Sequence, residues 1–230
     1  MKYINKILAL AVLWSIPTIA TAQKGKEAGQ NTPAALELQK AGYLWMHTDN
    51  AAGLQLDNPT SFTKVDLGYE TQSGNFKKPQ QGKNIENILF NAEGSTFLQS
   101  IYLWGSFKYS RQNIDEAGFN ASLIDPYRGM PYYTVDTLQS NWNNQYYTLQ
   151  MKGATKPLWN FVSFGLDLQY QTASGAKQRD PRSENQQYAI KVKPGVVFSI
   201  TPKHHIGFNL QYSNYKEQSD MENANSYVNQ

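Results

Sequence analysis

Residues 158–170 read LWNFVSFGLDLQY, and from Val162 onward they alternate strictly between apolar and polar side chains. The even positions up to Tyr170 are apolar, and the odd positions between them are Ser163, Gly165, Asp167 and Gln169. A period of two predicts a β-strand with one apolar and one polar face. The stretch is 13 residues long, whereas strands of soluble proteins average about 5–6 residues and a tilted membrane-spanning strand needs about 9–11.

The same period recurs along the chain from about residue 61. Residues 97–109 and 188–200 are equally long stretches, and shorter ones lie at 65–69, 147–151 and 206–212. A further segment, about 85–92, is apolar without clean alternation. We therefore predict seven strands. Pro194 lacks a ladder donor and predicts a bulge or kink inside its strand.

Long and short connections are predicted to alternate between these strands. Short turns are expected at about 93–96, 153–157 and 201–204, and long polar loops at about 74–84, 111–144 and 173–184. Short periplasmic turns and longer extracellular loops are typical of an outer-membrane barrel. The sequence therefore predicts an all-β fold, an antiparallel up-and-down transmembrane β-barrel. A soluble β-sandwich also alternates apolar and polar residues and remains the alternative.

The composition of the 230-residue chain fits the barrel prediction. Its charged residues make up 17% and its net charge is +3, while 20 Asn and 20 Gln supply much of the polarity. The absence of cysteine excludes disulfides and Cys-ligated metals. A charge of +3 without a basic cluster gives no case for nucleic acid as a partner.

The N-terminus is predicted to direct export. Residues 1–22 have a basic start, a short apolar stretch and an A-x-A ending, which predicts a secretory signal peptide cleaved between Ala22 and Gln23. Residues 23–31 are predicted to be a disordered lead-in. We expect the mature protein in the outer membrane.

A short helix is expected next, because Thr32 suits an N-cap, Pro33 a first helical position and Gly42 a helix end. The apolar stretch 43–46 and a small-residue turn at 50–54 follow it. We interpret residues 32–60 as the short helix and a plug-like cap at the periplasmic end of the barrel, which then occupies residues 61–230.

Seven strands do not close a barrel of the usual even number. Residues 216–230 are polar and are interpreted as the start of an outer loop, so the sequence is expected to be the N-terminal portion of a longer barrel. The segment 225–230 is too short and too polar to be a closing strand.

Several short motifs suggest a family. They are Leu44-Trp45, Asn50-Ala51-Ala52-Gly53-Leu54, Ala92-Glu93-Gly94, Leu103-Trp104-Gly105-Ser106-Phe107, Pro126-Tyr127-Arg128-Gly129 and Gln145-Tyr146-Tyr147. Over about residues 43–215 the chain resembles an uncharacterised outer-membrane β-barrel family of Bacteroidota, similar to accessory barrels found beside TonB-dependent receptors. The resemblance implies outer-membrane lipid as surroundings and a TonB-dependent receptor or surface lipoprotein as partner. It supplies no catalytic or ligand residue.

Charged residues on the polar strand faces are the candidates for a lumen or ligand site. They are Lys64, Asp66, Glu70, Lys108, Lys152, Asp167, Lys191 and Lys193, with His205 on the same face. Their mild positive bias would favour anionic solutes in a pore, or the charges pair across strands and fill the lumen.

Catalysis is not expected. The chain has three histidines; His204 and His205 are adjacent, so they point to opposite faces of a strand and do not suit one metal. We predict no catalytic residue, metal or cofactor. Asp115-Glu116, residues 128–133 with Trp142, and Asp180-Pro181-Arg182 are expected in outer loops. The functions considered are solute passage or an accessory role in TonB-linked uptake, and alternatively a secreted all-β glycan-binding or adhesion protein.

Overall fold

The computed structural model describes residues 32–119 and 137–222, and the chain divides into two compact units, residues 1–42 and 43–230. In the first unit, helix α2 (Pro33–Ala41) begins and ends where the sequence predicts. The Thr32 side chain accepts a hydrogen bond from the Ala35 N–H at 3.2 Å, and the Gly42 N–H bonds to carbonyls of the last turn. The predicted signal peptide and lead-in, residues 1–31, lie outside the described residues.

None of the helices in the described residues is long and apolar enough to cross a membrane.

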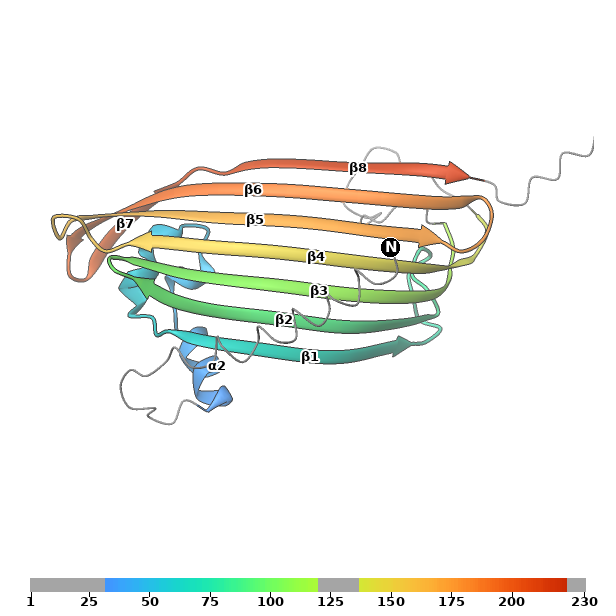
Figure 1. The fold of residues 1–230 in the computed structure, drawn as a ribbon, viewed down its shortest axis with the longest axis horizontal. Helices are drawn as coiled ribbons and strands as arrows, with labels where there is room; N and C mark the ends of the chain where they lie inside the picture. The colour runs from blue at the N-terminus through green and yellow to red at the C-terminus, as the bar shows by residue number, and fades with distance from the viewer. Residues whose placement is uncertain (1–31, 120–136, 223–230) are drawn as a thin grey trace, which may run out of the picture. The chain divides into compact units, whose positions relative to one another are not determined.

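The second unit is an antiparallel sheet in which strands adjacent in the sequence lie side by side (Figure 1). This confirms the predicted all-β, up-and-down fold. The sheet is not closed, because β1 pairs only with β2 within the described ranges. The strands are β1 (Phe62–Ser73), β2 (Asn84–Leu98), β3 (Ile101–Ala117), β4 (Ser140–Thr155), β5 (Val162–Lys177), β6 (Arg182–Thr201), β7 (His204–Asn209) and β8 (Tyr212–Glu222).

The predicted seventh strand is divided at residues 210–211, opposite Pro194 of β6. Both β7 and β8 pair with β6, and the pairs Gly195↔Asn209 and Val192↔Tyr212 on either side of the break keep the same register, which shifts only between Ser199 and Thr201. The Leu210 N–H still bonds to the Pro194 carbonyl at 3.0 Å, but proline has no N–H to return. The ladder is therefore interrupted opposite Pro194 without the extra residue of a bulge.

Strand ends differ from the prediction, because pairing continues into segments whose side chains are mostly polar or small. The expected turn at 93–96 lies inside β2, and the chain reverses at residues 99–100 instead. The expected long loop at 173–184 shrinks to 178–181, and β8 extends through 216–222. Backbone groups pair whatever the side chain, so apolar alternation stops before the strands do.

Four predicted loop positions are corrected, because the strands extend farther than predicted. Asp115 and Glu116 belong to β3, Trp142 belongs to β4, and Arg182 is the first residue of β6. Asp180 lies in the short connection as expected and pairs with Arg182 at 3.2 Å. Residues 128–133 and 223–230 lie outside the described residues.

Two short 3-10 helices precede the sheet, η1 (Trp45–His47) and η2 (Ala51–Asp57). We call residues 43–60 the docked segment, because η2 contacts β4, β5 and β6. The face of the sheet that it covers is called the inner face and the opposite one the outer face. The small-residue turn expected at 50–54 is thus the first part of η2.

Candidate functional site

Three of the predicted lumen residues form one row across the inner face. Lys152 on β4 lies directly opposite Asp167 on β5, which in turn lies opposite Lys193 on β6. All three are buried, and the Lys193 ammonium lies 3.8 Å from the Asp167 carboxylate. Gln150 on β4 donates a hydrogen bond to the same carboxylate at 3.0 Å. The row is therefore one carboxylate between two ammonium groups.

Both lysines of this row bind the docked segment. The Lys152 Nζ donates to the Met46 carbonyl at 2.8 Å, and the Lys193 Nζ donates to the Asp49 carboxylate at 2.6 Å. The lysines thus take their remaining hydrogen-bond acceptors from a segment more than 100 residues away in the sequence. The buried charges of the sheet and the docked segment neutralise one another across this contact.

Asp49 is the exposed member of the pair, with 67% of its side chain accessible against 11% for Lys193. The hydrogen bond and the charge of Lys193 lower the pKa of the Asp49 carboxyl below its ordinary value of 3.8, and Lys152 and Lys191 act in the same direction. Because the charged form is favoured in the docked state, docking is stabilised wherever Asp49 is ionised.

The docked segment is expected to loosen only in acid. A carboxyl with a lowered pKa stabilises the docked state above its ordinary pKa, and that stabilisation is lost as the pH falls below 3.8 toward the lowered value. Hydrogen exchange of residues 43–57, corrected for the intrinsic pH dependence of exchange, measures this loosening. The Asp49→Asn variant should exchange faster at neutral pH and show no further acid transition; an unchanged transition in that variant would assign it to another group.

Asn50 fixes the segment to two strands at once. Its side-chain amide donates to the Val196 carbonyl on β6 and to the Phe208 carbonyl on β7, each at 3.1 Å. Its side-chain oxygen accepts from the Ala52 N–H at 3.0 Å and so caps η2. One buried side chain therefore starts the 3-10 helix and binds it to the sheet.

Glycines on the inner face make room for this approach. A Cβ atom on Gly165 would lie 2.1 Å from the Ala52 nitrogen, and one on Gly195 would lie 2.2 Å from the Asn50 side-chain oxygen. Gly165 and Gly195 are direct ladder partners, and Gly207 on β7 lies close to the Asn50 amide nitrogen. A glycine-lined path thus crosses three strands and accepts the backbone of residues 50–52.

The rest of the segment packs on a small core and caps itself. Leu54 is buried with Tyr102 and Ala154, and Gln55 donates to the Ala154 carbonyl at 2.8 Å. The Asp57 carboxylate accepts three backbone N–H bonds, from residues 44, 45 and 46, at 2.9–3.1 Å. These bonds close the segment into a compact unit that docks as a whole.

The other predicted lumen residues lie away from this site. Lys64 and Asp66 pair with each other at 3.2 Å on β1. Glu70, Lys108 and Lys191 stand at polar positions of their strands, and none of them binds the docked segment. The sequence did not single out Asp49 or Asn50. The signal was the set of glycines at polar-face positions of three strands.

Two of the histidines, His204 and His205, lie apart from the row, and His47 belongs to η1 of the docked segment. His204 and His205 begin β7, and their ring Nδ1 atoms lie 2.8 Å from the Thr201 hydroxyl and 2.9 Å from the Ser199 hydroxyl. No metal-binding group of three His, Asp or Glu occurs among the described residues. The chemistry of the site is therefore that of holding a peptide segment with charges, amides and close backbone contact.

The outer face carries a continuous apolar belt. Across one row of the ladder, Phe107, Leu149, Tyr170 and Ile190 are neighbours on β3 to β6, and each is 37–46% exposed. On β6 every second residue from Tyr188 to Ile200 is apolar. These 12 steps cover about 40 Å along the strand, or about 30 Å at a tilt near 40°. The belt has the height of a bilayer core.

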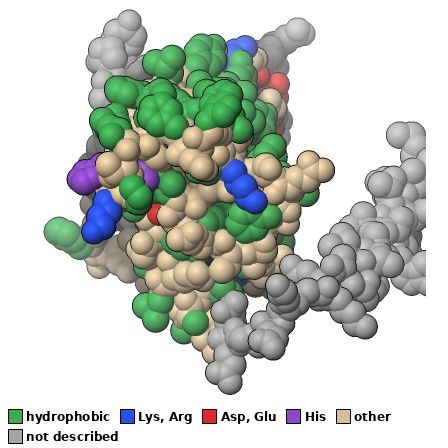
Figure 2. Space-filling model, turned by 90° about the vertical axis from the view of Figure 1, so that its left-hand side faces the viewer, with side chains coloured by type: hydrophobic (Ala, Val, Ile, Leu, Met, Phe, Trp, Pro, Cys, Tyr) green, Lys and Arg blue, Asp and Glu red, His purple; other side chains and the backbone are tan. Residues whose placement is uncertain are grey.

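The end of the sheet at which the chain turns at 99–100 and 202–203 is seen face on in Figure 2. Hydrophobic side chains gather densely in the upper part of this view, whereas polar side chains and backbone fill much of its centre. Trp159, in the turn between β4 and β5, is 86% exposed, and Phe161 is 49% exposed. Aromatic side chains are therefore exposed at the end of the sheet where the docked segment lies.

Comparison with known proteins gives a match to a protein family. Residues 51–230 match a family described as a family of unknown function, DUF6850. This range includes η2 and every strand. No curated protein and no solved structure matches the chain.

Proposed function

The chain belongs to the DUF6850 family, and we propose that it is a non-enzymatic outer-membrane β-barrel protein that serves solute passage or assists a TonB-linked uptake system. The observation that carries the proposal is the contrast between the two faces of one sheet. The outer face presents an uncharged apolar belt, while the inner face buries Lys152, Asp167 and Lys193 under the docked segment. A monomeric soluble protein rarely exposes an apolar patch of this extent.

In this proposal the docked segment is the plug. It binds at the end of the sheet that carries the shortest turns, which is the periplasmic end of an outer-membrane barrel. It occupies the inner face at Gly165 and Gly195, where a solute would otherwise pass. Passage therefore requires that the segment leaves or shifts. A sheet that spans a membrane must also close, so the free edges of β1 and β8 must pair with further strands.

Cell fractionation of the strain that produces the protein tests the proposal. The protein should sediment with the outer membrane and migrate differently on a gel when it is not boiled, because a closed barrel resists detergent. Recovery as a soluble protein in the periplasm or medium would overturn the proposal and favour the secreted glycan-binding protein. A partner from a TonB-linked system should co-purify from detergent-solubilised outer membranes; if none does, solute passage remains as the proposed role.

The apolar belt gives a residue-level test. The Leu168→Arg substitution places a charge in the middle of the belt and should lower the free energy of unfolding by about 2–4 kcal/mol. The matched control is Ser174→Arg, on the same face of β5 but beyond the belt, which should change it by less than about 1 kcal/mol. Urea unfolding in lipid vesicles measures both. Equal effects of the two substitutions would contradict the membrane placement of the belt.

A further inference from the structure

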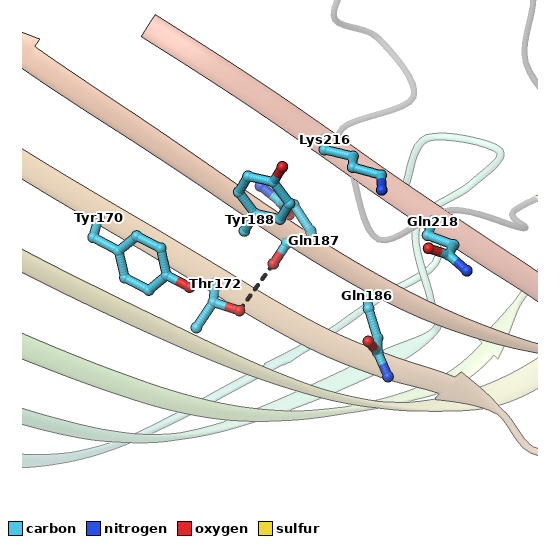
Figure 3. A pocket seen from close by; sticks show the side chains of 7 residues that line it. All are labelled: Tyr170, Thr172, Gln186, Gln187, Tyr188, Lys216 and Gln218. Carbon is cyan, nitrogen blue, oxygen red and sulfur yellow. Dashed lines mark hydrogen bonds between the residues drawn. The ribbon is translucent and has the colours of Figure 1, made fainter.

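A shallow hollow lies on the outer face where the apolar belt ends. It has a volume of about 220 Å³ and is lined by residues of β5, β6 and β8 (Figure 3). Tyr170 lies opposite Ile190, in the last row that is apolar from β3 to β6. The next row holds Thr172, Tyr188 and Lys216, and the row beyond it pairs Gln186 with Gln218. The hollow is thus apolar on one side and rich in hydrogen-bond donors on the other.

Lys216 is the first charge that the outer face presents past the belt on β8. No ion pair of Lys216 occurs in the described part of the chain. The nearest acidic pair along this ladder, Glu184 opposite Asp220, lies four residues farther from the belt, or about 13 Å along the strand. The border of the belt is therefore positive before the face becomes acidic.

The Thr172 hydroxyl donates a hydrogen bond to the Gln187 carbonyl at 2.9 Å. Other donors of the hollow are free to face a ligand. The Lys216 ammonium and the side-chain amides of Gln186 and Gln218 make no hydrogen bond with a described residue. Figure 3 shows Lys216 and Gln218 on one side of the hollow and Tyr170 on the other. An anion here would meet a cation and two amides, with the belt directly beneath.

We propose that this hollow binds a phosphate of lipid A, the anionic lipid of the outer leaflet, whose acyl chains lie along the apolar belt. The inference rests on the membrane placement of the proposed function. The ammonium of Lys216 supplies a charge-assisted hydrogen bond to the phosphate, the amides add neutral ones, and the tyrosine rings lie at the depth of the headgroups. The lipid thus joins β6 to β8 across the ladder.

Native mass spectrometry of the protein purified from its own membranes tests the site. In detergent micelles it should retain phosphorylated lipid A in preference to lipid A from which the phosphates have been removed, and Lys216→Gln should weaken retention of the phosphorylated form about tenfold, the worth of one charge-assisted hydrogen bond. Lys216→Arg should restore it. Lys203→Gln, in the turn between β6 and β7, is the control and should behave as the wild type.

The outcomes separate the possible sources of phosphate. Displacement of the lipid by inorganic phosphate at equal concentration would assign the hollow to free phosphate and overturn the lipid proposal. Unchanged retention in Lys216→Gln would overturn it as well, provided that the variant keeps the gel mobility of a folded barrel. Fractionation decides the proposed function separately, since a protein of the outer membrane without lipid preference would refute only this inference.

Discussion

Replacing Gly165 with valine is expected to release the docked segment from the sheet. The added Cβ would lie 2.1 Å from the Ala52 nitrogen and 2.5 Å from the Ala51 carbonyl carbon, and both are backbone atoms that cannot rotate away. Overpacking of this kind costs about 1–3 kcal/mol, so the undocked population should rise about tenfold or more. Limited proteolysis within residues 43–60 measures that population.

Gly105→Val is the matched control for this experiment. A Cβ atom on Gly105 would meet only the Gln150 carbonyl oxygen, at 3.7 Å, and Gly105 also lies in the middle of a long strand, β3. Its cleavage rate within residues 43–60 should equal that of the wild type. If the Gly165→Val variant is also cleaved no faster than the wild type, while its gel mobility without boiling is unchanged, the docked segment does not depend on the glycine path.

In the proposed plug role, Gly165→Val should also raise the ion conductance of the protein in a planar lipid bilayer. In the wild type the docked segment occupies the inner face, and its departure would open this face to ions. A variant in which the segment becomes protease-sensitive but the conductance stays at the wild-type level would separate docking from plugging, and it would contradict the plug.

Asp167→Asn should produce the second large effect. The substitution keeps the volume of the side chain but removes the only carboxylate of the sheet that lies between the buried ammonium groups of Lys152 and Lys193. Removing one partner of a buried ionic group costs about 3–5 kcal/mol, because Asp49 is then the one carboxylate left for the two buried ammonium groups. Urea unfolding of the purified protein measures this as a fall in the free energy of unfolding.

Asp66→Asn is the control for this substitution. Asp66 also pairs with a lysine on the polar face, but that pair is far more exposed, at 30% and 43%, and such pairs contribute less than about 1 kcal/mol. A second variant combines Asp167→Leu with Lys152→Met and Lys193→Met, which replaces the whole row by apolar groups. It should recover the stability of the sheet and still fail to hold the docked segment. Wild-type unfolding of Asp167→Asn would contradict the role assigned to the row.

The sequence predicted the fold to the extent that side-chain alternation reports on it. Strands β5 and β6 and the helix at Pro33 were found because apolar periodicity and capping residues are local signals. The last residues of β3 and β5 and the first residues of β4 were missed because many of them, such as Asn113, Asn143 and Ser174, are polar or small. A polar stretch has the same appearance in a loop as in a strand that has left the apolar belt.

For a related reason, the sequence predicted the charged residues of the sheet but not those of the docked segment. Lys152, Asp167 and Lys193 stood out as charges on polar faces, but their direct opposition depends on the register of three strands, which turn lengths set. Asp49 and Asn50 lay in the segment 32–60, which was interpreted as a short helix and a plug-like cap, but neither was singled out as a contact. Their partners lie 144 to 158 residues later in the sequence, and no local pattern encodes such a contact.

These separations also set the order of folding. Each hairpin of the sheet joins neighbouring parts of the chain, whereas the bond from Asn50 to Phe208 closes a loop of 158 residues, and loop closure of that length is entropically costly and slow. The glycine path does not exist until β5, β6 and β7 have paired. Although residues 43–60 precede every described strand in the sequence, they can take their place only after β5, β6 and β7 have paired, so docking follows the assembly of strands that are made much later.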